Sequence, residues 1–174
     1  LVGVTVGLLG GFIATRPRWL VAGLVAVPLI GGLILVTPAA QDRLLGLARD
    51  SAFYHAGHVL SSGYSYKILD ERYYRDRGLI TDMPAREAAV YVWRSIVSYV
   101  TEPVPWRSES MAMRVYLPEQ VVWMVVLALS PIGLVAGLRR DAMLTSLLAA
   151  HAAAVMMMVA LTSGNIGTLI RHRG

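Results

Sequence analysis

The residues best suited to chemistry lie near the C-terminal end of the chain, in the run Arg171-His172-Arg173. Two guanidinium groups and an imidazole bind phosphate well, because charge-assisted hydrogen bonds to its oxygens are strong. The polar run before them, residues 163–168, offers flexible backbone N–H groups as further donors. We therefore predict a lipid- or phosphate-binding site made of Arg171, His172, Arg173 and Asn165. An interface anchor that meets lipid headgroups and a re-entrant segment are the alternatives.

Three other histidines are candidate ligands. His151 lies in an alanine-rich apolar stretch, where small neighbours leave room for a flat macrocycle such as haem or chlorophyll. A hydrogen bond to a neighbouring helix is the alternative for this imidazole. His55 and His58 are three residues apart and share a helix face, but two imidazoles without a third ligand make a poor metal site. We predict no metal site and name no cofactor, although bound lipid is expected.

The carboxylates show no pattern that marks a catalytic acid and base. Arginines alternate with them along the chain, which favours a solvated surface of ion pairs. The sequence contains no phosphate-cradling glycine loop, no nucleophile elbow and no HExxH motif. With no cysteine, disulfides and thiolate metal sites are excluded. These residues therefore predict no catalytic centre.

The elements that carry these residues are defined by the distribution of charge. Four stretches lack charged residues, namely 1–15, 19–36, 121–138 and 142–163. The segment between the second and third, 37–120, contains ten Lys/Arg and ten Asp/Glu, so the net charge of +5 lies at the ends of the apolar stretches. An eighteen-residue helix rises about 27 Å, close to the roughly 30 Å of a hydrocarbon core. We predict an all-α integral membrane protein with about four transmembrane helices.

The orientation follows from the short basic connections. Arg16-Pro17-Arg18 joins the first two apolar stretches and Arg139-Arg140-Asp141 joins the last two, so both connections are expected in the cytoplasm. The predicted domains are a hairpin over 1–36, an extramembrane insertion over 37–120, a second hairpin over 121–163 and an outer tail over 164–174. The first stretch is short for a crossing, and we expect it to be the end of a longer helix. A bacterial inner membrane with a periplasmic insertion is predicted.

The insertion is expected to be mainly helical. One amphipathic helix begins at Thr37-Pro38, and its apolar positions are Leu44, Leu45, Ala48, Ala52, Ala56 and Val59. A second begins near Asp82-Met83-Pro84 and ends at Glu102-Pro103, with an apolar face of Ala85, Ala88, Ala89, Val92, Trp93, Ile96, Val97 and Val100. We predict a compact turn or short paired strands over 61–78. The segment 103–118 is expected to follow the membrane surface, anchored by Trp106 and Tyr116.

Small residues recur at the spacing of one helical turn. Gly3, Gly7 and Gly11 form a ridge that allows close approach of another backbone, and Gly133 and Gly137 repeat this spacing after an expected kink at Ser130-Pro131. We predict helix packing at these five glycines, within the chain or with a partner. The alternative is the general abundance of glycine in bacterial membrane helices.

Several short motifs together resemble a known family. They are Gly63-Tyr64 with Leu69-Asp70, Glu102-Pro103-Val104-Pro105-Trp106, Leu117-Pro118-Glu119 and the run from Gly164 to Arg173. The sequence resembles the C-terminal part of polytopic bacterial membrane proteins that are found with envelope-polysaccharide genes. Those proteins are described as similar to glycosyltransferases that depend on a lipid-phosphate-linked sugar. The resemblance covers roughly residues 44–173. It implies shared ancestry and topology, whereas the family's catalytic carboxylate belongs to a first outer loop upstream of this region.

Three functions follow as hypotheses. The first is a non-catalytic accessory or scaffold subunit of a larger inner-membrane assembly, for example a photosynthetic or respiratory complex. The second is a fragment of a membrane glycosyltransferase that uses a polyprenyl-phosphate-linked sugar, with Arg171 and Arg173 on the phosphate. A transporter is weaker, because only Pro28, Pro131 and His151 would interrupt the apolar helices. The expected partners are membrane lipid and other integral membrane subunits. The scattered arginines form no basic face, so no nucleic-acid partner is expected.

Overall fold

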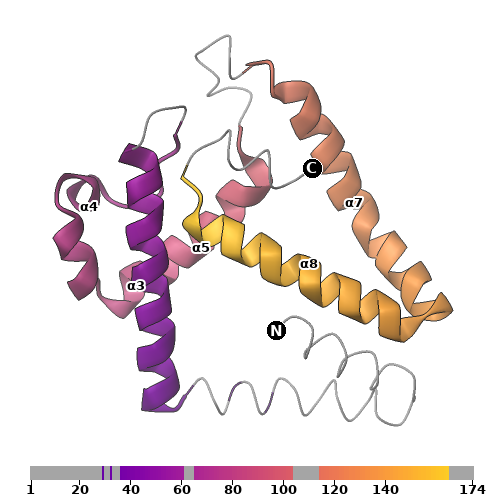
Figure 1. Ribbon diagram of the computed structural model, residues 1–174, viewed down its shortest axis with the longest axis horizontal. Helices are drawn as coiled ribbons and strands as arrows, with labels where there is room; N and C mark the ends of the chain where they lie inside the picture. The colour runs from indigo at the N-terminus through magenta and orange to yellow at the C-terminus, as the bar shows by residue number, and fades with distance from the viewer. Residues whose placement is uncertain (1–28, 30–31, 33–35, 61–64, 104–113, 165–174) are drawn as a thin grey trace. The chain divides into compact units, whose positions relative to one another are not determined.

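The computed structural model describes residues 29, 32, 36–60, 65–103 and 114–164, and every regular element within them is a helix (Figure 1). In chain order these elements are α3 (Pro38–Leu60), α4 (Glu71–Arg75), the 3₁₀ helix η1 (Arg77–Asp82), α5 (Ala85–Thr101), α7 (Leu117–Arg140) and α8 (Ala142–Thr162). The all-α prediction is confirmed for this part of the chain. The predicted crossings at 1–15 and 19–36 lie almost wholly outside the described residues.

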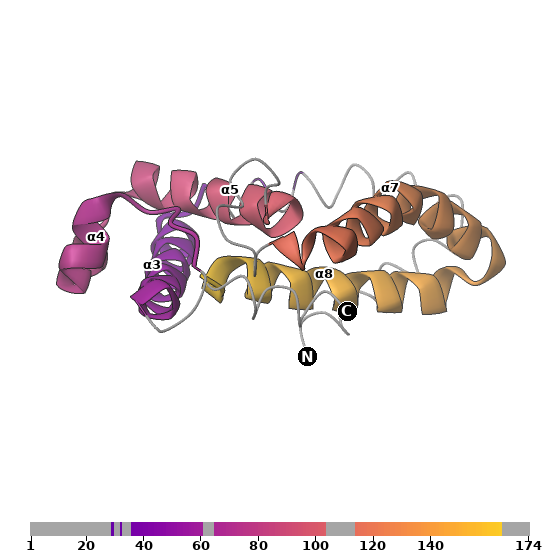
Figure 2. The ribbon, with the colours of Figure 1, turned by 90° about the horizontal axis from the view of Figure 1, so that it is seen from above.

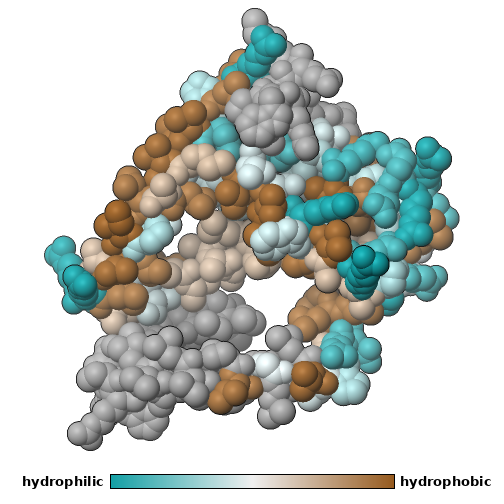
Figure 3. All heavy atoms as spheres, turned by 180° about the vertical axis from the view of Figure 1, so that it is seen from behind, coloured by the Kyte–Doolittle hydropathy of each residue, from teal (hydrophilic) through white to brown (hydrophobic). Residues whose placement is uncertain are grey.

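The chain divides into two compact units. The first unit comprises Leu1–Asp42 and Val126–Met156, and the second comprises Arg43–Val125 and Met157–Gly174. Within the described residues, the first unit is dominated by the apolar parts of α7 and α8, whereas the second holds nearly all the buried side chains. Figure 3 shows an apolar surface along α7 and hydrophilic side chains gathered around α4.

Helices α7 and α8 are both long and apolar enough to cross a membrane. They contain 24 and 21 residues, or about 36 and 31 Å of helix, against a hydrocarbon core of about 30 Å. In the most apolar 18-residue stretch of each helix, nothing of α7 and only 11% of α8 is buried. The helices predicted at 121–138 and 142–163 are therefore confirmed as elements.

A tight turn joins the two helices into a hairpin (Figure 2). Asp141 accepts a hydrogen bond from the backbone N–H of Leu144 at 3.0 Å and so caps the start of α8. A methyl group added at Gly137 would lie 2.8 Å from Thr145 Oγ1, so the helices approach closely at this point. Gly133 has open space beside it.

Proline 131 lies inside α7, and the neighbouring serine compensates for its missing donor. A proline has no N–H for the carbonyl four residues earlier, which here belongs to Leu127. The Ser130 hydroxyl donates to that carbonyl at 2.8 Å. The backbone oxygen therefore keeps a hydrogen bond, as an apolar environment requires.

Helix α3 confirms most of the first amphipathic prediction. It begins at Pro38, and its buried residues are Ala48, Ala52, His55, Ala56 and Val59. Leu44 was expected on this face but is 48% exposed. His55 takes the central buried position because its two ring nitrogens both find hydrogen-bond partners.

Helix α5 confirms the second helix and corrects its orientation. The helix runs over Ala85–Thr101, yet its buried residues are Ala88, Tyr91, Ser95 and Tyr99. Trp93, expected inside, is 67% exposed. The purely apolar positions form a face next to the one that packs. The packed face contains polar aromatic side chains, whose hydroxyl groups can be hydrogen-bonded when buried.

The turn or paired strands predicted over 61–78 are wrong for the end of that range. Residues Glu71–Arg75 form α4, and η1 begins at Arg77. The Asp76 carboxylate accepts a hydrogen bond from Gly78 N at 2.9 Å and so starts the 3₁₀ helix. Such short helices leave little periodicity in the sequence. Trp106 lies outside the described residues, and Tyr116 lies in a turn before α7.

Candidate functional site

A buried imidazole forms the centre of the second unit. His55 on α3 is fully buried among the rings of Tyr66, Tyr74 and Tyr91, with ring centroids 5.8, 6.3 and 6.0 Å away. Tyr74 comes from α4 and Tyr91 from α5. The packing of three aromatic rings around one imidazole therefore ties together elements that are far apart in sequence.

The hydrogen bonds of His55 define its tautomer. Nδ1 lies 2.9 Å from the carbonyl oxygen of Ser163, and because a carbonyl only accepts, Nδ1 carries the proton. Nε2 lies 3.1 Å from the Tyr74 hydroxyl and accepts its proton. The same hydroxyl oxygen accepts from the backbone N–H groups of Ile68 and Leu69 at 3.0 and 3.1 Å. Both ring nitrogens of His55 are thus engaged.

This cluster also caps the C-terminal end of α8. The last carbonyls of a helix lack partners within the helix. Here Tyr91 donates to Leu161 O, His58 to Thr162 O at 2.7 Å, and Tyr66 to Ser163 O at 2.7 Å. The backbone N–H of Tyr66 donates to Gly164 O at 3.0 Å. Side chains from α3, α5 and the segment before α4 therefore hold this helix end in place.

Burial controls the protonation of the cluster. Desolvation lowers the pKa of His55 to about 4. The hydrogen bond to the Ser163 carbonyl opposes this shift, and the electrostatic effect of His58 lowers the pKa by a smaller amount. Desolvation also raises the pKa of Tyr74 and of Tyr91. At neutral pH the imidazole is neutral and the phenols are protonated. With its lone pair engaged, the imidazole serves as a structural link rather than as a free base.

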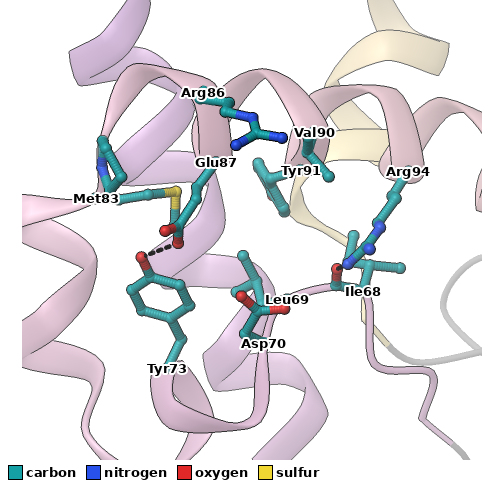
Figure 4. A pocket seen from close by; sticks show the side chains of 11 residues that line it. Ile68, Leu69, Asp70, Tyr73, Met83, Arg86, Glu87, Val90, Tyr91 and Arg94 are labelled. Atoms are coloured by element: carbon teal, nitrogen blue, oxygen red, sulfur yellow. Dashed lines mark hydrogen bonds between the residues drawn. The ribbon is translucent and has the colours of Figure 1, made fainter.

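An open groove lies on another face of the second unit, beside α5 (Figure 4). It has a volume of about 420 Å³, and its charged lining residues are Asp70, Arg86, Glu87 and Arg94. Glu87 is held by Arg72 at 2.6 Å and by the Tyr73 hydroxyl at 2.5 Å. The hydrogen bond from Arg72 lowers the pKa of Glu87 most, and the one from Tyr73 lowers it further. This carboxylate therefore stays ionised.

Comparison with protein-family models finds no match, and comparisons with curated proteins and with solved structures find none either. The function is therefore inferred from the residues of the chain itself.

Of the predicted site residues, the structure describes Gly133, Gly137 and His151. Arg171, His172, Arg173 and Asn165 lie outside the described residues, as do Gly3, Gly7 and Gly11. His151 is exposed on α8 and belongs to the first unit, whereas the histidines of α3 belong to the second. No group of three potential metal ligands occurs among the residues that the structure describes.

Sequence reasoning paired His55 with His58 but did not foresee different roles for them. His55 is buried, whereas His58 is exposed. A signal was available, because Ala48, Ala52, His55 and Val59 follow the spacing of one helix face. The tyrosine partners of His55 gave no such signal. Neither did the groove, whose charged residues come from two separate segments.

Proposed function

We propose that the chain is a non-catalytic integral-membrane accessory or scaffold subunit that packs within a larger assembly of the bacterial inner membrane. The observation that carries this proposal is an exposed apolar stripe outside the candidate spans. Val90, Trp93 and Val97 follow helical spacing on α5 and are 41, 67 and 39% exposed. Contiguous exposed apolar groups of this kind mark interaction surfaces, and tryptophan is enriched in the centres of interfaces.

A second stripe on α3 supports the same interpretation. Leu44, Leu47 and Tyr54 lie on one face of the helix and are 48, 64 and 64% exposed. The stripes belong to the second unit, whose hydrogen-bonded aromatic core supplies a rigid base for both helices. We infer that these stripes bind other integral membrane subunits, while α7 and α8 contact lipid.

The proposed topology has four crossings, with the extramembrane insertion in the periplasm. Its support is the basic pair Arg139 and Arg140 at the end of α7, which matches the basic connection at Arg16 and Arg18. The transferase alternative depends on Arg171 and Arg173, which lie outside the described residues, and it stays a prediction.

Cysteine labelling tests this topology, because the chain has no cysteine of its own. In intact spheroplasts, a membrane-impermeant maleimide is expected to label Asp82→Cys and to leave Arg140→Cys unlabelled until the membrane is opened. Both positions are exposed in the structure. Labelling of the two positions in the opposite order would reverse the orientation. Labelling of both in intact spheroplasts would exclude a membrane between them.

Co-purification tests the function. In mild detergent, the tagged chain is expected to elute with fixed, stoichiometric partner subunits. Trp93→Ala should reduce the retained partner at least about tenfold, since truncation of an interface tryptophan removes a large part of the binding energy. Leu79→Ala, an exposed apolar residue on η1, is the control and should leave the complex intact. Elution of the wild-type chain alone would contradict the proposal.

A further inference from the structure

We propose that the groove beside α5 is a binding site for a small acidic sugar, meaning a sugar that carries a phosphate or a carboxylate. Its volume of about 420 Å³ lies within the range of small-molecule pockets, which is about 300–1,000 Å³. The site belongs wholly to the second unit, and its lining comes from residues 68–73 and 83–94. The groove shares only Val90 with the apolar stripe of the scaffold proposal, and its charged residues lie outside that stripe, so the two proposals can fail separately.

One wall of the groove is cationic. Arg86, Val90 and Arg94 are spaced by four residues, so they follow one face of α5, with the two arginines about 12 Å apart along the helix. Figure 4 shows both arginine side chains beside the groove. Arg94 donates through Nη1 to Ile68 O at 3.1 Å, which leaves its other N–H groups for a ligand. Among the described residues, Arg86 makes no hydrogen bond or ion pair.

The opposite wall carries a carboxylate without a partner. Asp70 is exposed and occupies the N-cap position of α4. Its side chain makes no capping hydrogen bond to that helix. Its carboxylate makes no hydrogen bond or ion pair with any other residue that the structure describes. Glu87, by contrast, is already paired with Arg72 and accepts a hydrogen bond from Tyr73. The groove therefore offers two cations for an acidic group and one carboxylate that accepts from hydroxyl groups.

Apolar side chains complete the lining. The rings of Tyr73 and Tyr91 are only 3 and 1% exposed, so their faces are not open to a ligand. The apolar surface beside the charged groups comes from Leu69, Pro84 and Val90, none of which is buried. A sugar ring has an apolar C–H face and hydroxyl groups around its edge. A phosphate or carboxylate on such a ring matches all three features of the groove at once.

The test uses the whole chain in detergent and titrates four probes by calorimetry: glucose 1-phosphate, glucuronate, glucose and inorganic phosphate. Glucose 1-phosphate or glucuronate is expected to bind, and the tighter of the two identifies the acidic group. Arg86→Ala should weaken that binding at least about tenfold, because it removes a charge-assisted hydrogen bond. Arg75→Ala, an exposed arginine of α4 outside the groove, should have no effect.

The carboxylate is tested separately. Asp70→Asn should weaken the acidic sugar but leave inorganic phosphate as before or slightly tighter, because it removes a repulsive charge. Asp82→Asn, on the neighbouring η1, is the control. Equal binding of glucose and glucose 1-phosphate, unchanged binding in Arg86→Ala, or no binding of either acidic sugar would each overturn the proposal. Arg86 makes no hydrogen bond to a described residue, so its variant is expected to fold, and circular dichroism checks this.

Discussion

Gly164→Ala is expected to destabilise the second unit by about 3 kcal/mol, at the upper end of typical overpacking effects. A methyl group at this position would lie 2.6 Å from Val59 Cγ2, 2.8 Å from the His55 carbonyl oxygen and 3.2 Å from His55 Cε1. The carbonyl oxygen belongs to the backbone of α3 and cannot move without disturbing that helix. Gly164 O also accepts from Tyr66 N, so displacement of the glycine breaks the cap of α8.

The measurement is thermal unfolding in detergent, followed by the near-ultraviolet circular dichroism of the buried tyrosines. Gly46→Ala is the matched control, because Gly46 lies inside α3 and nothing stands within 4 Å of the added methyl group. That control should stabilise by up to about 1 kcal/mol, the difference between glycine and alanine in a helix. Equal melting temperatures for Gly164→Ala and the wild-type chain would show that this close approach is absent.

The long apolar helices could be predicted from the sequence because their cause is local. Charge-free runs of about twenty residues define α7 and α8. Asp141, at their junction, separates the two runs and caps the start of α8. Pro38 likewise marks the start of α3. These signals lie in the helix itself or within one turn of its end. A single sequence is therefore enough to reveal them.

The packed face of α5 and the contacts of the candidate site could not be predicted, because their cause is distant. Tyr91 and Ser95 are polar, so a rule that buries apolar residues selects the neighbouring face. His55 reaches Tyr74 across 19 residues and Ser163 across 108. No spacing rule encodes such contacts. The same holds for the groove, where Asp70 faces Arg86 only because α4 and η1 turn the chain back towards α5.

Acidification is expected to destabilise the second unit through His55. Its pKa in the folded protein is about 4, below the ordinary value of 6.5. Between these values the unfolded chain binds a proton that the folded protein does not, so stability increases with pH across this range. The contribution is constant above about pH 6.5, falls as the pH decreases towards 4, and then levels off. The full effect corresponds to about 3 kcal/mol.

His55→Gln isolates this effect from the other titrating groups. Glutamine cannot be protonated in this range but still offers a donor for Ser163 O and an acceptor for Tyr74. The variant should be less stable than the wild-type chain at pH 7, because its shape differs from that of the imidazole. Its melting temperature should nevertheless change little between pH 6.5 and 4.5, so the two curves approach each other on acidification. The phenols do not titrate here, because the ordinary pKa of tyrosine is 10 and burial raises the pKa of Tyr74 and Tyr91 further above this range.

His58→Gln is the control, since His58 shares the helix and the nearby carbonyls but is exposed. It should keep the steep pH dependence of the wild-type chain. Glu87 also has a lowered pKa, and its stabilising contribution is lost at low pH in all three proteins, so it cancels in the comparison. If His55→Gln melts with the same pH dependence as the wild-type chain, the imidazole is not the buried neutral group that holds the end of α8. If only His58→Gln flattens the curve, the two histidines have exchanged roles.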